Sequence, residues 1–134
     1  MSGSLVPTLR YDDASAAITL LTEGFGFTVR ARHEGPTGRV VHAELVHGTG
    51  MVMLGSTPLP GEDRLEMDLG AASTYVILPA DADVDAHAGR AVVAGAILVR
   101  PPTDEDYGGR GYTCRDLEGH WWSFGTYDPW GPLG

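Results

Sequence analysis

The tetrapeptide HAEL places the imidazole of His42 and the carboxylate of Glu44 two residues apart. Side chains at alternate positions of a strand point to the same face, so a strand here would bring the two groups together. A histidine beside a carboxylate can act as a general base or can orient a ligand. Two polar side chains on an outward-facing strand are also commonplace, and two ligands without a third are weak evidence for a metal site. His42 and Glu44 are therefore candidates for catalysis or for ligand binding.

The segment DLEGHWWSFGTYD, residues 116–128, predicts a turn followed by a strand. If Ser123 faces a cleft, alternation places Trp121 on the same side and turns Trp122 and Phe124 toward the helix layer. Trp122 is then a core residue, whereas Trp121 offers a flat surface that can stack on aromatic or cationic groups. Packing of Trp121 in a dimer interface is an equally open interpretation.

The segment PPTDEDYGGRG, residues 101–111, combines a stiff start, three acids and a flexible pair of glycines. We expect a loop in which Tyr107 and Arg110 close over a bound ligand while the acids attract a cation, as a lid would require. A mobile acidic hairpin without that role fits the same residues. Tyr112, which follows directly, and Met53 complete the set of side chains expected to line a cleft.

The elements that must position these residues occur twice in the same order, strand, helix, strand, strand, strand. The first run covers residues 5–56 and the second residues 72–127, joined by the proline- and acid-rich segment 57–71. The two halves align without a gap at a constant offset that places the potential N-cap Asp13 on Asp83. One helix on one small sheet leaves the other sheet face bare, so two halves or two chains must bury it together.

The composition, 43% hydrophobic and 20% charged over 134 residues, predicts a single globular domain, 1–134. The net charge of −9 argues against a nucleic-acid-binding protein, because such proteins present a basic surface. Such a charge favours neutral or cationic ligands, unless it serves only solubility. No apolar run approaches the roughly 18 residues that span a bilayer, so we expect a cytoplasmic protein without a membrane partner.

Cys114 is the only cysteine in the sequence, so an intramolecular disulfide framework and a zinc site built on thiolates are both excluded. We expect Cys114 to be a small buried hydrophobe. His87 is expected at an exposed position of the second helix, with a solvated side chain.

The repeated module, the phrase GFGF after the first helix and a Gly-Arg followed by Asp-x-x-Gly before the last strand resemble the vicinal oxygen chelate superfamily. That superfamily includes glyoxalase I, extradiol dioxygenases, fosfomycin-modifying enzymes and bleomycin resistance proteins. The resemblance extends from about Val6 to Tyr127. It implies an α+β fold of two βαβββ modules, whose paired, mixed sheets curl around a cleft.

In metal-dependent members, the resemblance implies one metal ligand on the first strand and one on the fourth strand of each module. The matching positions here are Val6 and Met53 in the first half, and Val76 and Ser123 in the second. None of them suits the divalent ions that these enzymes use, because valine has no donor, thioether sulfur is soft and a lone hydroxyl is neutral. We therefore expect no metal and no cofactor, as in the bleomycin resistance proteins, which are acidic homodimers that bind a cationic antibiotic.

The sequence thus predicts a metal-independent small-molecule-binding protein, a homodimer that sequesters an aromatic or cationic antibiotic or natural product. Pairing of the modules within one chain or between chains stays open. The alternative is an enzyme of the same superfamily, a lactoylglutathione lyase-like lyase, an isomerase or a dioxygenase, that uses His42 and Glu44 or a displaced metal site.

Overall fold

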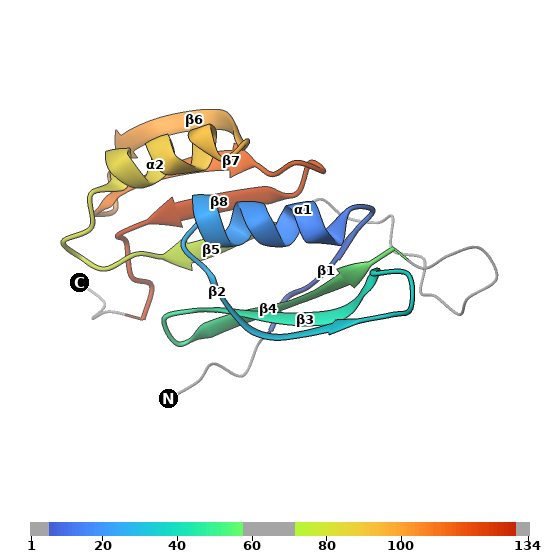
Figure 1. Cartoon of the computed structure of the whole chain (residues 1–134). Helices are drawn as coiled ribbons and strands as arrows, with labels where there is room; N and C mark the ends of the chain where they lie inside the picture. Colours follow the sequence, from blue (N-terminus) through green and yellow to red (C-terminus); the bar gives the residue numbers. More distant parts are fainter. Residues whose placement is uncertain (1–5, 58–71, 131–134) are drawn as a thin grey trace. The chain divides into compact units, whose positions relative to one another are not determined.

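The computed structural model describes residues 6–57 and 72–130 (Figure 1). The chain forms two compact units, residues 1–71 and 72–134. Each unit has the order strand, helix, strand, strand, strand, which confirms the predicted α+β arrangement of repeated modules. Positions 58–71 of the predicted connector lie outside the described residues. No helix in the described part of the chain is long and apolar enough to cross a membrane.

The first unit consists of a helical segment and four strands: β1 (Thr8–Tyr11), α1 (Ala14–Thr19), a π-helical turn (Leu20–Gly24), β2 (Thr28–Glu34), β3 (Val40–His47) and β4 (Gly50–Ser56). Its sheet has the order β1-β4-β3-β2. β1 runs parallel to β4, and the remaining neighbours are antiparallel, so the sheet is mixed. α1 packs against β1 and β4.

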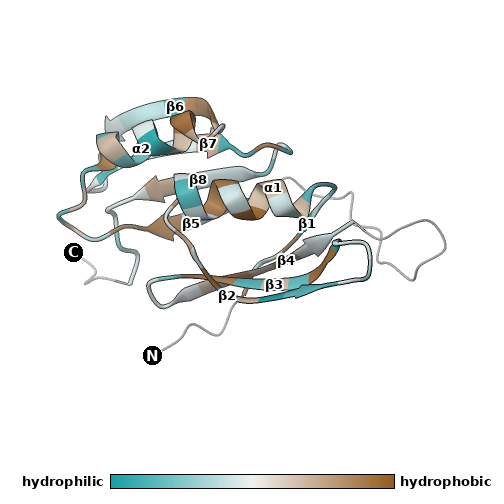
Figure 2. Cartoon of the chain, viewed as in Figure 1, coloured by the Kyte–Doolittle hydropathy of each residue, from teal (hydrophilic) through white to brown (hydrophobic). Residues whose placement is uncertain are grey.

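The second unit repeats this plan with β5 (Ser73–Ile77), α2 (Val84–Val93), β6 (Ile97–Asp104), β7 (Arg110–Arg115) and β8 (Trp121–Gly125). Its sheet has the order β5-β8-β7-β6, with β5 parallel to β8. α2 packs against β6 and β7. Both helices alternate hydrophobic and hydrophilic turns in Figure 2, as expected for helices buried on one side.

Both predicted helix starts are confirmed by their caps. The Asp13 carboxylate accepts a hydrogen bond from the Ala16 amide at 3.0 Å, and the Asp83 carboxylate accepts one from the Ala86 amide at 3.0 Å. Each bond satisfies one of the amides that the first turn of a helix leaves without an intrahelical partner.

The gapless alignment of the two halves is wrong at the first strands. It places Val6 on Val76, whereas the sheet pairing places Thr8 on Tyr75, because these two residues lie opposite equivalent positions of β4 and β8. Val76 points into the core and is buried. The segment between β5 and α2 is longer than the one between β1 and α1, and a gapless alignment cannot absorb that difference.

The core of the second unit lies between its sheet and α2. Trp122, Phe124 and Cys114 are fully buried there, as the sequence predicts. The expectation for His87 is wrong, because its ring is buried and packs 4.7 Å from the ring of Phe124. The Nδ1 atom of His87 lies 2.6 Å from the hydroxyl of Tyr112, which supplies a hydrogen-bond partner for a buried polar group.

Candidate functional site

The sheet of the second unit has one face turned away from α2, which we term the helix-distal face. Strand alternation and the sheet register place on this face the side chains of Ser73, Tyr75, Arg100, Thr113, Arg115, Trp121 and Ser123. Thr113 and Ser123 lie opposite each other on β7 and β8, and their hydroxyl oxygens are 2.8 Å apart. Arg100 on β6 and Tyr75 on β5 extend this row to both edges of the sheet.

Two glycines beside this row allow the close approach of their neighbours. Gly111 on β7 pairs with Gly125 on β8. A Cβ atom at Gly125 would lie 2.7 Å from the Tyr75 hydroxyl oxygen, and one at Gly111 would lie 2.9 Å from the carbonyl oxygen of Phe124. Neither position tolerates a side chain without a shift of its neighbours. A pocket of about 130 Å³ lies on this face, and its lining includes Tyr75, Arg100, Glu105, Thr113 and Tyr127. Four residues predicted from the sequence also line it, namely Tyr107, Arg110, Tyr112 and Ser123.

The aromatic lining of the pocket includes Tyr75, Tyr107 and Tyr127, in addition to the buried residues Tyr112 and Phe124. The Tyr75 hydroxyl donates a 2.7 Å hydrogen bond to the carbonyl oxygen of Tyr127. The rings of Tyr107 and Tyr127 meet edge to face, with centroids 4.8 Å apart at an interplanar angle of 83°. Burial, together with nearby negative charge, raises the pKa of Tyr75 to about 12. The Tyr75 hydroxyl therefore keeps its proton, and its role as a donor, throughout the physiological pH range.

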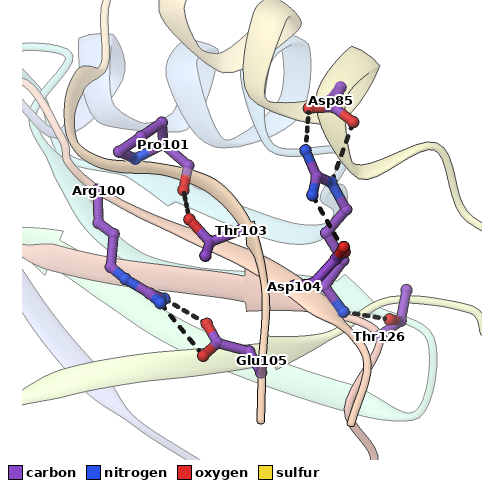
Figure 3. Close-up of polar contacts among 8 residues, drawn as sticks. Asp85, Arg100, Pro101, Thr103, Asp104, Glu105 and Thr126 are labelled. Carbon is purple, nitrogen blue, oxygen red and sulfur yellow. Dashed lines mark hydrogen bonds and ion pairs between the residues drawn. The ribbon is translucent and has the colours of Figure 1, made fainter.

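An ion pair forms the polar part of the pocket. Arg100 donates two hydrogen bonds to the carboxylate of Glu105, one from each terminal guanidinium nitrogen (Figure 3). The Glu105 side chain is 13% exposed, whereas the Arg100 side chain is 47% exposed, so the carboxylate lies deeper in the wall. The hydrogen bond from Arg100 holds the pKa of Glu105 below its usual range. Glu105 is thus a charged carboxylate at neutral pH.

Arg110 does not form part of a mobile loop, contrary to the expectation for residues 101–111. Its guanidinium donates to both carboxylate oxygens of Asp85 on α2, at 3.0 and 3.1 Å, and to Asp104 on β6 at 3.1 Å. Strand β6 continues through the two prolines as far as Asp104. The connection to β7 is the short turn 105–109, closed by a 2.9 Å hydrogen bond from the Glu105 amide to the carbonyl of Gly109.

The burial of the two adjacent tryptophans agrees with the prediction that one is a core residue and the other is not. Trp121 is 45% exposed on the helix-distal face, and Trp122 is 0% exposed in the core. Ser123 lies on the same face as Trp121, as predicted. Tyr112 lines the pocket, as expected, but its phenol group points away from it. Its side chain is 1% exposed and its hydroxyl contacts His87, so the phenol faces α2, where burial raises the pKa of Tyr112.

The first unit holds the remaining candidates on one face of its own sheet. The Nε2 atom of His42 lies 3.0 Å from Glu44, whose other carboxylate oxygen accepts a 2.5 Å hydrogen bond from Arg30. Met53 on β4 pairs with Glu44 across the sheet. Hydrogen bonds from His42 and Arg30 lower the pKa of Glu44, so this carboxylate is charged at neutral pH.

Several residues of the pocket lining were not predicted from the sequence, among them Tyr75, Arg100, Thr113 and Tyr127, as well as the pairing of Glu105 with Arg100. Tyr75 was not predicted because the gapless alignment puts Val76 at the position that Tyr75 occupies in the sheet. The contact between Tyr75 and Tyr127 joins positions far apart in the chain, and no local pattern announces it. The position of Arg100 on a strand next to an acidic turn gives only a weak indication of an ion pair.

The family positions for metal ligands can be tested against the corrected register. They are Thr8 and Met53 in the first sheet, and Tyr75 and Ser123 in the second. These side chains do not suit a hard divalent ion. Thr8 and Ser123 offer neutral hydroxyls, Tyr75 a phenol that keeps its proton, and Met53 a thioether. Within residues 6–57 and 72–130, no three histidine, cysteine, aspartate or glutamate side chains gather closely enough to share a metal. The described donor set therefore does not fit such an ion.

Comparison with known proteins finds relatives along most of the chain. The family model for the Glyoxalase/Bleomycin resistance protein/Dioxygenase superfamily matches residues 5–124. The protein Mb0911c of Mycobacterium bovis is 33% identical over 125 residues, which is 91% of this chain and 82% of that protein. The protein Rv0887c of Mycobacterium tuberculosis is also 33% identical over 125 residues, which is 91% of this chain and 73% of that protein.

Solved structures share the fold. TioX from Micromonospora sp. ML1 is 36% identical, with a TM-score of 0.70, and the match covers 92% of this chain and 98% of TioX. The fosfomycin resistance protein FosX from Mesorhizobium loti matches with a TM-score of 0.65 at 18% identity, over 96% of this chain and 95% of that protein. At 18% identity, the similarity to FosX shows a shared fold alone.

Proposed function

The chain belongs to the Glyoxalase/Bleomycin resistance protein/Dioxygenase superfamily, and we propose that it is a metal-independent small-molecule-binding protein. Its site is the helix-distal face of the second unit. The observation that supports this proposal is the lining of the pocket, which includes the rings of Tyr75, Tyr107 and Tyr127. Its arginines, Arg100 and Arg110, are already paired with carboxylates. Such a wall offers flat apolar surface and few groups for bond-breaking chemistry.

The size of the pocket supports a ligand that is only partly enclosed. Its volume of about 130 Å³ is smaller than the roughly 300–1,000 Å³ of sites that enclose a drug-sized molecule. It accommodates one ring or one arm of a larger molecule. Trp121 lies on the same face, one side-chain row away along β8, and its exposed indole can stack on the remainder of such a ligand.

The charge of the protein supports a neutral or cationic ligand. The net charge of −9 repels anions, and Glu105 places a carboxylate in the pocket wall. An aromatic or cationic natural product, such as an antibiotic that the protein sequesters, is the specific form of the proposal. A homodimer is the proposed assembly, as the family resemblance implies.

Replacement of Trp121 tests the stacking role. Trp121→Ala is expected to weaken binding of aromatic compounds by about 2- to 12-fold, because aromatic pairs contribute about 0.5–1.5 kcal/mol beyond the area that they bury. The measurement is a calorimetric titration of the purified protein with a panel of neutral and cationic aromatic compounds. Trp130→Ala is the matched control, since Trp130 is 88% exposed and follows the end of β8 at Gly125. Unchanged affinity in Trp121→Ala would refute the stacking role, and a panel without any binder would refute the proposed function.

A second candidate function, acid–base catalysis, is favoured by the 3.0 Å contact between His42 and Glu44. A charged Glu44 can orient the His42 ring and stabilise its protonated form, as the acidic partner of a catalytic histidine does. If the protein is an enzyme of this kind, His42→Gln should reduce turnover by about 100- to 10,000-fold. Turnover that survives this substitution, in an assay against superfamily substrates, would exclude the pair as the catalytic group.

A further inference from the structure

Three tyrosine rings line the pocket together. The rings of Tyr107 and Tyr127 stand nearly perpendicular, at 83°, as neighbouring walls of an aromatic cage do. Tyr75 forms a third part of the lining, and its hydrogen bond to the backbone of Tyr127 fixes its position. The face of an aromatic ring carries negative potential and attracts cations within about 6 Å. Three rings around one small hollow therefore create a site that suits a cation without hydrogen-bond donors.

Arg100, a cation of the protein itself, already lies in the pocket wall beside Glu105. The Arg100 guanidinium caps the Glu105 carboxylate, and the pKa of Arg100 is raised, first by the hydrogen bond to Glu105 and also by the proximity of Tyr107. Arg100 is the exposed partner, and its long side chain is anchored only at this contact among those described. A ligand cation can therefore take its place beside Glu105 while Arg100 moves into solvent, where its charge is hydrated.

The lining of the pocket suits an alkylated cation, because much of it is aromatic ring. The hydroxyl of Tyr75 donates to the Tyr127 carbonyl, and the hydroxyls of Thr113 and Ser123 are bonded to each other, so their oxygens and Glu105 are the acceptors that remain for a ligand. A primary ammonium carries three donors that lose their hydration on entry and need acceptors in return. A quaternary ammonium has no N–H group and needs only charge and ring faces.

We propose that the pocket recognises an alkylated ammonium group, with Tyr75, Tyr107 and Tyr127 as the cage and Glu105 as the counter-ion. This inference rests on the proposed function and specifies the chemical class of the ligand. The alkylated ammonium enters as one arm of the ligand, and the remainder extends along the helix-distal face toward Trp121.

The test compares choline with 3,3-dimethyl-1-butanol, which has the same shape but no charge, in NMR titrations of the ¹⁵N-labelled protein. Choline is expected to bind about 2- to 30-fold more tightly than its neutral isostere, with shifts at the amides around the pocket. Tyr107→Leu should remove most of this preference, because it deletes a ring face at a 65% exposed position where folding is not at risk. Tyr107→Phe is the matched control and should keep the preference, since it retains the ring. Glu105→Gln should reduce the preference for choline, because it removes the counter-ion.

Equal affinity for choline and its isostere would overturn the cage, as would a preference that Tyr107→Leu leaves intact. If neutral aromatic compounds bind at the same amides without any preference for choline, the ligand class is wrong and the proposed function stands. If neither choline nor any compound of the aromatic panel binds, both fail.

Discussion

Trp122→Ala is expected to lower the free energy of unfolding by about 3–5 kcal/mol, whereas Trp121→Ala should change it by less than about 1 kcal/mol. Trp122 is fully buried and stacks on Phe124, with ring centroids 6.4 Å apart. Its indole nitrogen also donates a 3.0 Å hydrogen bond to Asp116, a buried carboxylate that holds the turn before β8. Truncation therefore leaves a cavity and removes one donor from a buried charge.

Urea denaturation of the two variants, followed by far-ultraviolet circular dichroism, measures this contrast. Trp122→Phe separates the two contributions, because it keeps most of the packing and removes the indole donor. We expect Trp122→Phe to fall between the wild type and Trp122→Ala. Similar losses of stability for Trp121→Ala and Trp122→Ala would contradict the assignment of the two side chains to opposite faces of β8.

Gly125→Ala is expected to weaken ligand binding by roughly 10-fold, because overpacking costs about 1–3 kcal/mol and 1.4 kcal/mol corresponds to a factor of ten. The added methyl group would lie 2.7 Å from the Tyr75 hydroxyl oxygen, so the Tyr75 ring, which lines the pocket, must move. The measurement is the dissociation constant of any compound that the aromatic panel identifies.

A double variant separates this local effect from a general loss of stability. Tyr75→Phe removes the oxygen that the new methyl group would meet, so Gly125→Ala combined with Tyr75→Phe should recover most of the lost affinity. Val76→Ala serves as the control, because Val76 is buried on the opposite side of β5 and its truncation lowers stability without altering the helix-distal face. A double variant that binds no better than Gly125→Ala alone would refute the role of this glycine in shaping the pocket.

Local patterns in the sequence were sufficient to predict the elements and their order. The alternation around Trp121 and Trp122 and the caps at Asp13 and Asp83 depend only on neighbouring residues, and the structure confirms them. The register of β5 depends instead on the length of a loop, and a gapless alignment of the two halves therefore misplaced Tyr75.

The errors around the pocket have a similar origin. The two prolines after Arg100 suggested a loop, but β6 is an edge strand with a register shift at this point, where missing amide donors cost little. Tyr112 was assigned to the cleft, although its pairing with the core residue Phe124 turns it toward α2. The expected burial of Cys114 already implies this orientation, because alternation along β7 places Tyr112 on the same face as Cys114.

The most direct test of the account is a calorimetric titration of the chelator-treated protein with the panel of neutral and cationic aromatic compounds, repeated with nickel, zinc, manganese or iron(II) present. We expect at least one compound to bind in the presence of the chelator, with one site per chain and an affinity that none of the four metals changes. Binding that requires an added metal, or the absence of binding under every condition, would contradict it.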